Sequence, residues 1–223
     1  MQVIISTILS MLLFLISAPL VLTTDVEVTG IPNTINGLPV GTIGFVGTFE
    51  GLEGVTITAN GTLNEIFAQA QRDHPEWKPN FTHPGHRGPP VDRTLISRAE
   101  NVGLEQEHKE QIYCWPLAGR PDLQRADSYW VDRLIELMVA VKAEVYVPRR
   151  TCNRFVCLGD ATAYLCNEND REVHFNSWLL ATYVGDIRYT CLTGWNGKTG
   201  LVCGLETDTD RWYVHVNKQI PNC

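Results

Sequence analysis

Cysteine is absent from the first 113 residues of this chain of 223 residues, although the whole chain contains seven cysteines. Charged residues and histidine are absent from residues 1–24. After residue 24 there is no apolar run near the ~18 to 20 residues that a transmembrane helix requires. An excess of basic residues is also missing, since the formal net charge is −7. These absences disfavour a membrane-spanning body and disfavour binding to nucleic acid or anionic lipid through a basic surface.

The apolar segment of the chain is its uncharged N-terminus, residues 1–24. Apolar side chains dominate residues 3–22, and Thr23, Thr24 and Asp25 follow them. This pattern is typical of a secretory signal peptide at residues 1–24, cleaved near Thr23 or Thr24. The mature protein is therefore expected to be secreted without a membrane anchor. Two glycosylation triplets, at Asn60 and Asn80, would be glycan acceptors in the secretory lumen.

The cysteines indicate a disulfide framework rather than a metal site. The chain has no paired Cys-x-x-Cys elements with partner histidines, and exported proteins use clustered cysteines mainly for disulfides. We therefore expect no metal ion and no other cofactor. The odd number leaves one thiol free or paired with another chain, and the spacing leaves the connectivity open. The seven are Cys114, Cys152, Cys157, Cys166, Cys191, Cys203 and Cys223.

Before the cysteines, two kinds of segment are predicted. Residues 25–73 contain a hairpin, from strands at 42–49 and 55–58, and then a short helix in which Thr62 and Glu65 have the spacing of a capping box. Residues 74–111 contain five prolines and few core-forming residues, which predicts an extended and exposed linker.

Residues 112–223 are predicted to form a cysteine-rich α+β domain. Apolar spacings of three and four residues predict a helix over 123–143, capped by Asp122, and another over 177–191, capped by Asn176 or Ser177. Strands are expected at residues 144–147, 154–158, 162–166, 200–205 and 212–216. The economical packing places both helices on one face of an antiparallel sheet, with the N-terminal hairpin and helix as an appendage.

Several segments together resemble a known family. The segments YCWP (113–116), CNRFVC (152–157), ATAYLCNEND (161–170) and TDTDRWYVHV (207–216) are similar to small secreted cysteine-rich proteins of fungi, and ANGTLNEIFAQ (59–69) is similar to a stretch that precedes this domain in them. The expected architecture also resembles fungal killer toxins that block calcium channels, and effectors of plant-pathogenic fungi. No toxin motif matches residue by residue, so the toxin likeness supplies no site.

The resemblance also bears on the free thiol. Cys203 stands where the family pattern has another residue, so the resemblance implies that Cys203 is free. Three bridges would then form among the other six cysteines, with 15 pairings open. These six are Cys114, Cys152, Cys157, Cys166, Cys191 and Cys223.

Catalytic chemistry finds little support in the sequence. No Gly-x-Ser-x-Gly element or protease-like cysteine setting is present. His174, Glu172, His215 and Arg211 are the residue types that acid–base ribonuclease chemistry needs, but the pattern favours an exposed strand histidine among surface charges. The acidic segment ETDTDR, with Glu206, Asp208 and Asp210, lacks the ligand offsets of a calcium loop and is predicted to be a solvated hairpin turn.

Trp195 is the residue that the sequence selects for binding. It lies in the glycine-bounded segment TGWNGKTG, and a large ring at a loop tip is often a contact residue. We therefore expect a secreted fungal effector or killer-toxin-like protein that binds an extracellular target, either a host or competitor protein or a cell-surface glycan. The alternatives are a secreted hydrolytic enzyme such as a ribonuclease, and a precursor whose acidic N-terminal part is removed.

Overall fold

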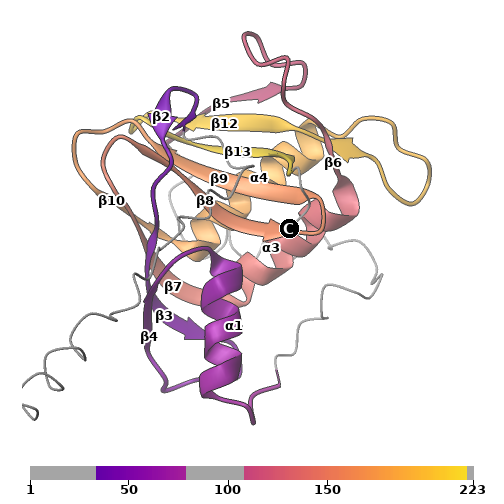
Figure 1. The fold of residues 1–223 in the computed structure, drawn as a ribbon. Helices are drawn as coiled ribbons and strands as arrows, with labels where there is room; N and C mark the ends of the chain where they lie inside the picture. Colours follow the sequence, from indigo (N-terminus) through magenta and orange to yellow (C-terminus); the bar gives the residue numbers. More distant parts are fainter. Residues whose placement is uncertain (1–33, 79–107, 220–223) are drawn as a thin grey trace, which may run out of the picture. The chain divides into compact units, whose positions relative to one another are not determined.

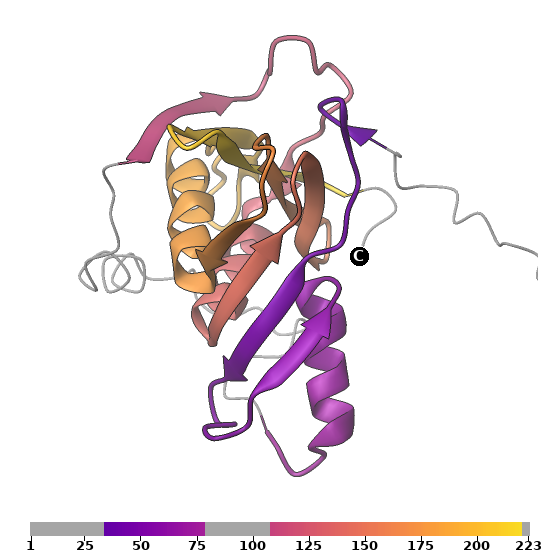
Figure 2. The same cartoon turned by 90° about the vertical axis from the view of Figure 1, so that its left-hand side faces the viewer.

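A computed structural model describes residues 34–78 and 108–219 of the chain (Figures 1 and 2). Within these ranges the chain forms a mixed α+β fold with three α-helices, and the pairings between its named strands are antiparallel. The predicted α+β class is therefore confirmed. The predicted signal peptide, Asn80 and Cys223 lie outside the described residues.

A five-stranded sheet forms the centre of the cysteine-rich region. Its strand order is β5-β12-β13-β9-β8. The bounds are β5 Lys109–Cys114, β12 Gly204–Asp208, β13 Trp212–Lys218, β9 Ala161–Asn167 and β8 Thr151–Leu158. Strand β5 was not predicted, because its sequence KEQIYC is polar at the start and the predicted linker included residues 109–111.

A second sheet joins the N-terminal hairpin to the cysteine-rich region. Its order is β10-β7-β3-β4, with β10 Val173–Asn176, β7 Val141–Val147, β3 Gly44–Phe49 and β4 Ile57–Asn60. The hairpin was correctly predicted, but it is not an appendage. Strand β3 pairs with β7 over six residues, and its buried Phe45 and Phe49 belong to the main core.

Helix α1, Leu63–Asp73, begins at the predicted capping box. The Glu65 backbone N–H donates to the Thr62 hydroxyl at 3.3 Å, and the Thr62 backbone N–H donates to the Glu65 carboxylate at 2.7 Å. Leu63, Ile66 and Ala70 are buried on the inner stripe of the helix. Figure 2 shows α1 lying alongside β3 and β4.

Helices α3, Ser128–Val139, and α4, Ser177–Thr190, pack against each other, and both contact strands of the five-stranded sheet. Asn176 caps α4 as predicted, with its side chain accepting from Trp178 N–H at 2.9 Å. The prediction for α3 was wrong at both ends. Asp127, not Asp122, is its N-cap. The helix ends at Val139, and strand β7 begins at Val141.

Two short pairs of strands complete the described fold. Strands β6, Ala126–Asp127, and β11, Leu201–Val202, pair immediately before α3, which explains why the helix cannot start earlier. Strands β1, Thr34–Ile35, and β2, Leu38–Pro39, form a hairpin whose Ile35 packs in a small cluster on the five-stranded sheet. Both ends of the segment predicted as a linker are structured, because Trp77 is buried and residues from Lys109 onwards belong to β5, and residues 79–107 lie outside the described residues.

Candidate functional site

Large apolar side chains are exposed at the end of strand β5 and around the loop that follows residue 190. Among the described residues, four large hydrophobic side chains are exposed, and we call them the aromatic surface. They are Tyr113, Trp115, Trp195 and Leu201. Trp195, which the sequence selected, is 49% exposed; the other three were not predicted as contact residues.

A disulfide brings these segments together. Cys114 at the end of β5 is bonded to Cys191, the C-cap of α4. Trp115 follows the first cysteine, and the loop that carries Trp195 follows the second. The bond therefore anchors both segments at the same place, although they are separated by 77 residues in the chain.

Arg125 connects the two segments at the surface. Its guanidinium lies 4.4 Å from the centre of the Trp115 ring, and one of its nitrogens donates to the Thr193 hydroxyl at 2.9 Å. The Trp115 indole N–H donates to the Leu123 carbonyl at 3.2 Å. These contacts hold the Trp115 ring in place while part of it remains exposed.

The Trp195 loop is closed at its base and is structured internally. Thr193 and Leu201 exchange two backbone hydrogen bonds of 2.8 and 2.9 Å across the base. The Asn196 side chain accepts from the backbone N–H groups of Lys198 and Thr199 at 3.0 and 2.9 Å. Because the loop is fixed in this way, Trp195 is presented on an ordered turn, which lowers the entropy cost of binding.

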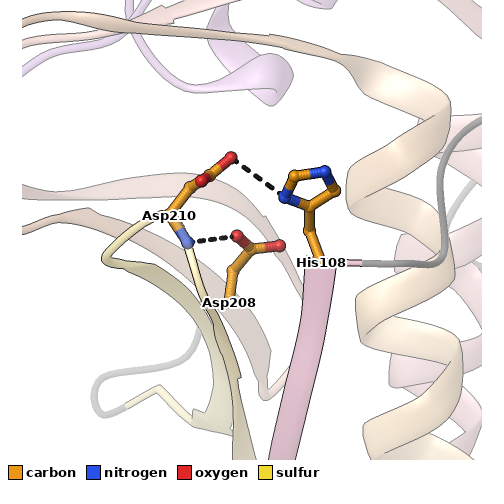
Figure 3. Close-up of side chains that lie close together, drawn as sticks. All are labelled: His108, Asp208 and Asp210. Atoms are coloured by element: carbon orange, nitrogen blue, oxygen red, sulfur yellow. Dashed lines mark hydrogen bonds and ion pairs between the residues drawn. The ribbon is translucent and has the colours of Figure 1, made fainter.

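At the other end of β5, three potential metal ligands lie close together. One ligand atom from each of His108, Asp208 and Asp210 lies within 4.8 Å of the others (Figure 3). His108 Nδ1 is 3.3 Å from an Asp210 carboxylate oxygen, and the Asp210 backbone N–H donates to Asp208 at 2.8 Å.

The hydrogen bonds of these residues are those of an ordered turn rather than those of a metal centre. One Asp208 oxygen accepts from the Asp210 N–H, and the other accepts from the Tyr183 hydroxyl. Three ligand atoms are also one fewer than a closed structural zinc site uses. The prediction of a solvated turn was nevertheless wrong for two of the acidic residues, because Glu206 and Asp208 are buried and only Asp210 is exposed.

Ionisable side chains of β5, β12 and α4 also lie close to one another, and they are buried or partly buried. Lys109 forms an ion pair with Asp186, and its ammonium group is 4.5 Å from the centre of the Tyr183 ring. Glu206 is 3% exposed, and one of its carboxylate oxygens has no hydrogen-bond partner in the described part of the chain. Burial raises the Glu206 pKa to about 8, and nearby Lys109 opposes this shift only in part. Glu206 is therefore largely protonated at neutral pH.

The residue types considered for ribonuclease chemistry are not assembled into a site. His215 lies on β13 and is 1% exposed, and neither ring nitrogen has a hydrogen-bond partner among the described residues. The expectation of an exposed strand histidine was therefore wrong. Burial lowers the His215 pKa to about 3, so the ring is neutral at ordinary pH. His174 lies on β10 in the other sheet, exposed and 3.1 Å from Glu172.

The cysteines form disulfides in the structure. Cys114 is bonded to Cys191 and Cys152 to Cys166, while Cys157 is also disulfide-bonded. Cys203 is free and buried, and it is the cysteine that the sequence singled out.

Asn60, in the first glycosylation triplet, is exposed at the end of β4. No helix within the described ranges is long and apolar enough to cross a membrane.

Comparisons with protein families, with curated proteins and with solved structures found no match to this chain.

Proposed function

We propose that this chain is a secreted, effector-like or toxin-like binding protein of fungal type, and that the aromatic surface is where it contacts an extracellular target. The observation that carries the proposal is the Cys114–Cys191 bond, which anchors Trp115 and the Trp195 loop together. Tryptophan, tyrosine and arginine are enriched among the residues that dominate binding energy at protein interfaces. An ordered display of such residues favours binding over a purely structural role.

The composition of the aromatic surface favours a protein target over a glycan. Sugar-binding platforms need a free aromatic face, but Arg125 covers one face of the Trp115 ring. Leu201 adds apolar area that a polar sugar would not use. A protein partner can use all of these groups, since interface cores combine aromatic, aliphatic and arginine contacts.

Cell binding separates the two kinds of target. The full chain would be secreted from a eukaryotic host, labelled, and added to intact plant and fungal cells. We expect saturable binding that is lost when the cells are treated with protease beforehand. Binding that survives protease but is lost after periodate oxidation of surface sugars would assign a glycan. Absence of saturable binding to either cell type would contradict the proposal.

The enzymatic alternative has its own assay. The secreted protein and its His174→Ala and His215→Ala variants would be tested for hydrolysis of RNA and polysaccharides. We expect no activity, because His215 is buried and neutral and His174 lies on the other sheet. An activity that either substitution abolishes would replace the binding proposal with an enzymatic one.

A further inference from the structure

A cavity of about 560 Å³ lies against strands β5, β12 and β13. Leu205, Thr207 and Tyr213 on the neighbouring strands β12 and β13 are among its lining residues. The lining also includes Asn36 from the β1–β2 hairpin and the acidic residues Glu110 and Glu168. A volume of this size is within the range of small-molecule sites.

The walls of this cavity are fixed by hydrogen bonds that cross between elements. The Asn36 side-chain amide donates to the Tyr213 hydroxyl at 2.7 Å, over a separation of 177 residues. The Thr207 hydroxyl donates to Glu110 at 3.1 Å. Asn36 and Gly37 have φ of 53° and 79°, the left-handed values that a tight two-residue hairpin turn requires. The turn holds Asn36 over the sheet, so the cavity is preformed.

The charges at the cavity are predominantly negative. Glu110, Glu168 and Asp208 supply three carboxylates, and Arg211 is the one basic residue of the lining. Asp208 is buried. One of its carboxylate oxygens accepts a hydrogen bond from the Asp210 backbone N–H, and the other accepts one from the Tyr183 hydroxyl. Glu110 and Glu168 are exposed and can meet a ligand directly. Arg211 also acts on Asp170, outside the lining, so it offsets the negative field only in part.

We propose that this cavity, which we call the acidic pocket, binds a protonated amine or a guanidinium group. Such a group can pair with the exposed carboxylates. The Thr207 hydroxyl and the Asn36 side-chain amide can contact polar atoms of the ligand that lie next to its charged group. A free polyamine and a lysine or arginine side chain of a protein share this chemistry. The proposal does not depend on the aromatic surface, because none of the four residues of that surface lines the pocket.

Calorimetric titration at low ionic strength tests the acidic pocket. The probes are spermidine, a tri-arginine peptide and, as a charge-reversed control, a tri-glutamate peptide. We expect at least one cationic probe to bind with one-to-one stoichiometry, and the tri-glutamate peptide not to bind. Binding of the peptide alone would identify a protein side chain as the ligand, and binding of spermidine would identify a free amine.

Charge-neutral variants locate the binding. The double substitution Glu110→Gln with Glu168→Gln should weaken cation binding by about tenfold, since each exposed charge pair contributes modestly. Glu76→Gln, an exposed glutamate outside the pocket, is the matched control and should bind as the original protein does. Circular dichroism confirms that all variants fold. Failure of both cations to bind, or equal binding by the double variant, would overturn the proposal.

Discussion

Asn64 on α1 makes a two-way hydrogen bond with the backbone of Cys157 on β8, across 93 residues of sequence. Its side-chain oxygen accepts from the Cys157 N–H at 2.9 Å, and its side-chain nitrogen donates to the Cys157 carbonyl. One asparagine thus satisfies both backbone groups of a residue in the cysteine-rich region. Together with the β3–β7 pairing, this contact makes the N-terminal elements part of one fold.

Asn64→Ala should therefore destabilise the whole described fold. The substitution removes both hydrogen bonds between the Asn64 side chain and the Cys157 backbone, which costs about 1 to 3 kcal/mol. Urea unfolding followed by circular dichroism and by tryptophan fluorescence measures the loss, and both signals should shift together. The matched control is Gln69→Ala, which changes an exposed side chain on the same helix and should leave the unfolding midpoint nearly unchanged. Separate transitions for the two signals would show that the N-terminal elements fold independently.

If the chain is a precursor whose N-terminal part is removed, the cysteine-rich region should fold without residues 25–73. Removal of residues 25–73 would take β3 away from β7, remove the buried Phe45 and Phe49 from the core, and uncover Trp77, which packs against Phe49. We expect a chain that starts at residue 74 to aggregate or to remain unfolded when it is secreted from the same host. A soluble, cooperatively melting fragment would support removal of the N-terminal part during maturation.

Two buried ionisable groups predict how stability depends on pH. Glu206 has a folded pKa raised by burial to about 8, so it stabilises the fold most below pH 4.5 and loses this contribution as the pH rises towards 8. His215 has a folded pKa lowered by burial to about 3, so its titration takes nothing from the stability above pH 6.5 and lowers the stability as the pH falls towards 3. Between about pH 4.5 and 6.5 the two effects oppose each other and the stability should be greatest.

Melting temperatures measured from pH 3 to pH 9 check this profile. Each group contributes at most about 1.4 kcal/mol for each pH unit within its own window. In Glu206→Gln, the stability relative to the original protein should rise between pH 4.5 and 8, whatever constant offset the substitution adds. In His215→Phe, the loss on the acid side should shrink. A stability difference that is independent of pH in both variants would mean that these groups do not titrate as described.

How far the sequence predicts this fold depends on which residues carry the signal. The capping box at Thr62 and Glu65 and the Asn176 cap are local, so sequence spacing was enough to find them. The end of α3 was misjudged because Val141 continues the helical spacing of Met138 and also begins the alternation of β7. Both patterns fit one short segment, and pairing with β3 decides between them.

The candidate sites depend on contacts between distant segments, which sequence spacing cannot reveal. Trp195 could be selected because its loop is bounded by glycines, but the proximity of Trp115 depends on a disulfide of open connectivity. The burial of His215 was missed because the alternation in β13 is apolar on one face only. Residues 115–125 and the β1–β2 hairpin meet the other face, and nothing local in β13 indicates this.

The two described disulfides should differ in their contribution to stability. The Cys114–Cys191 bond spans 77 residues and the Cys152–Cys166 bond spans 14. Loop-closure entropy predicts losses of about 4.5 and about 3 kcal/mol when each pair is replaced by serine. Chemical unfolding of the two double-serine variants measures this. The first variant should also lose binding to cells, because that bond anchors the aromatic surface, whereas the second should keep it if it folds.

Cys203 should be the unreactive thiol of the folded protein. Burial raises its pKa to about 11, so the thiolate that reacts with alkylating agents is scarce. Alkylation of the unreduced protein should be slow in buffer and rapid in denaturant, and mass spectrometry should find the label on Cys203. Cys203→Ser should cost about 1 to 3 kcal/mol for burying a hydroxyl and leave a folded monomer. A label on another cysteine, or a dimer linked through Cys203, would contradict this assignment.

The most direct test of the binding account is the affinity of a loop variant for the cell surface. Trp195→Ala with Leu201→Ala removes the two apolar side chains of the Trp195 loop and its base, and Lys198→Ala in the same loop is the matched control. We expect the double variant to bind at least about thirtyfold more weakly, because interface hot spots are lost. The control should bind as the original protein does. Equal binding by the double variant, with its fold intact, would show that the aromatic surface is not the contact site.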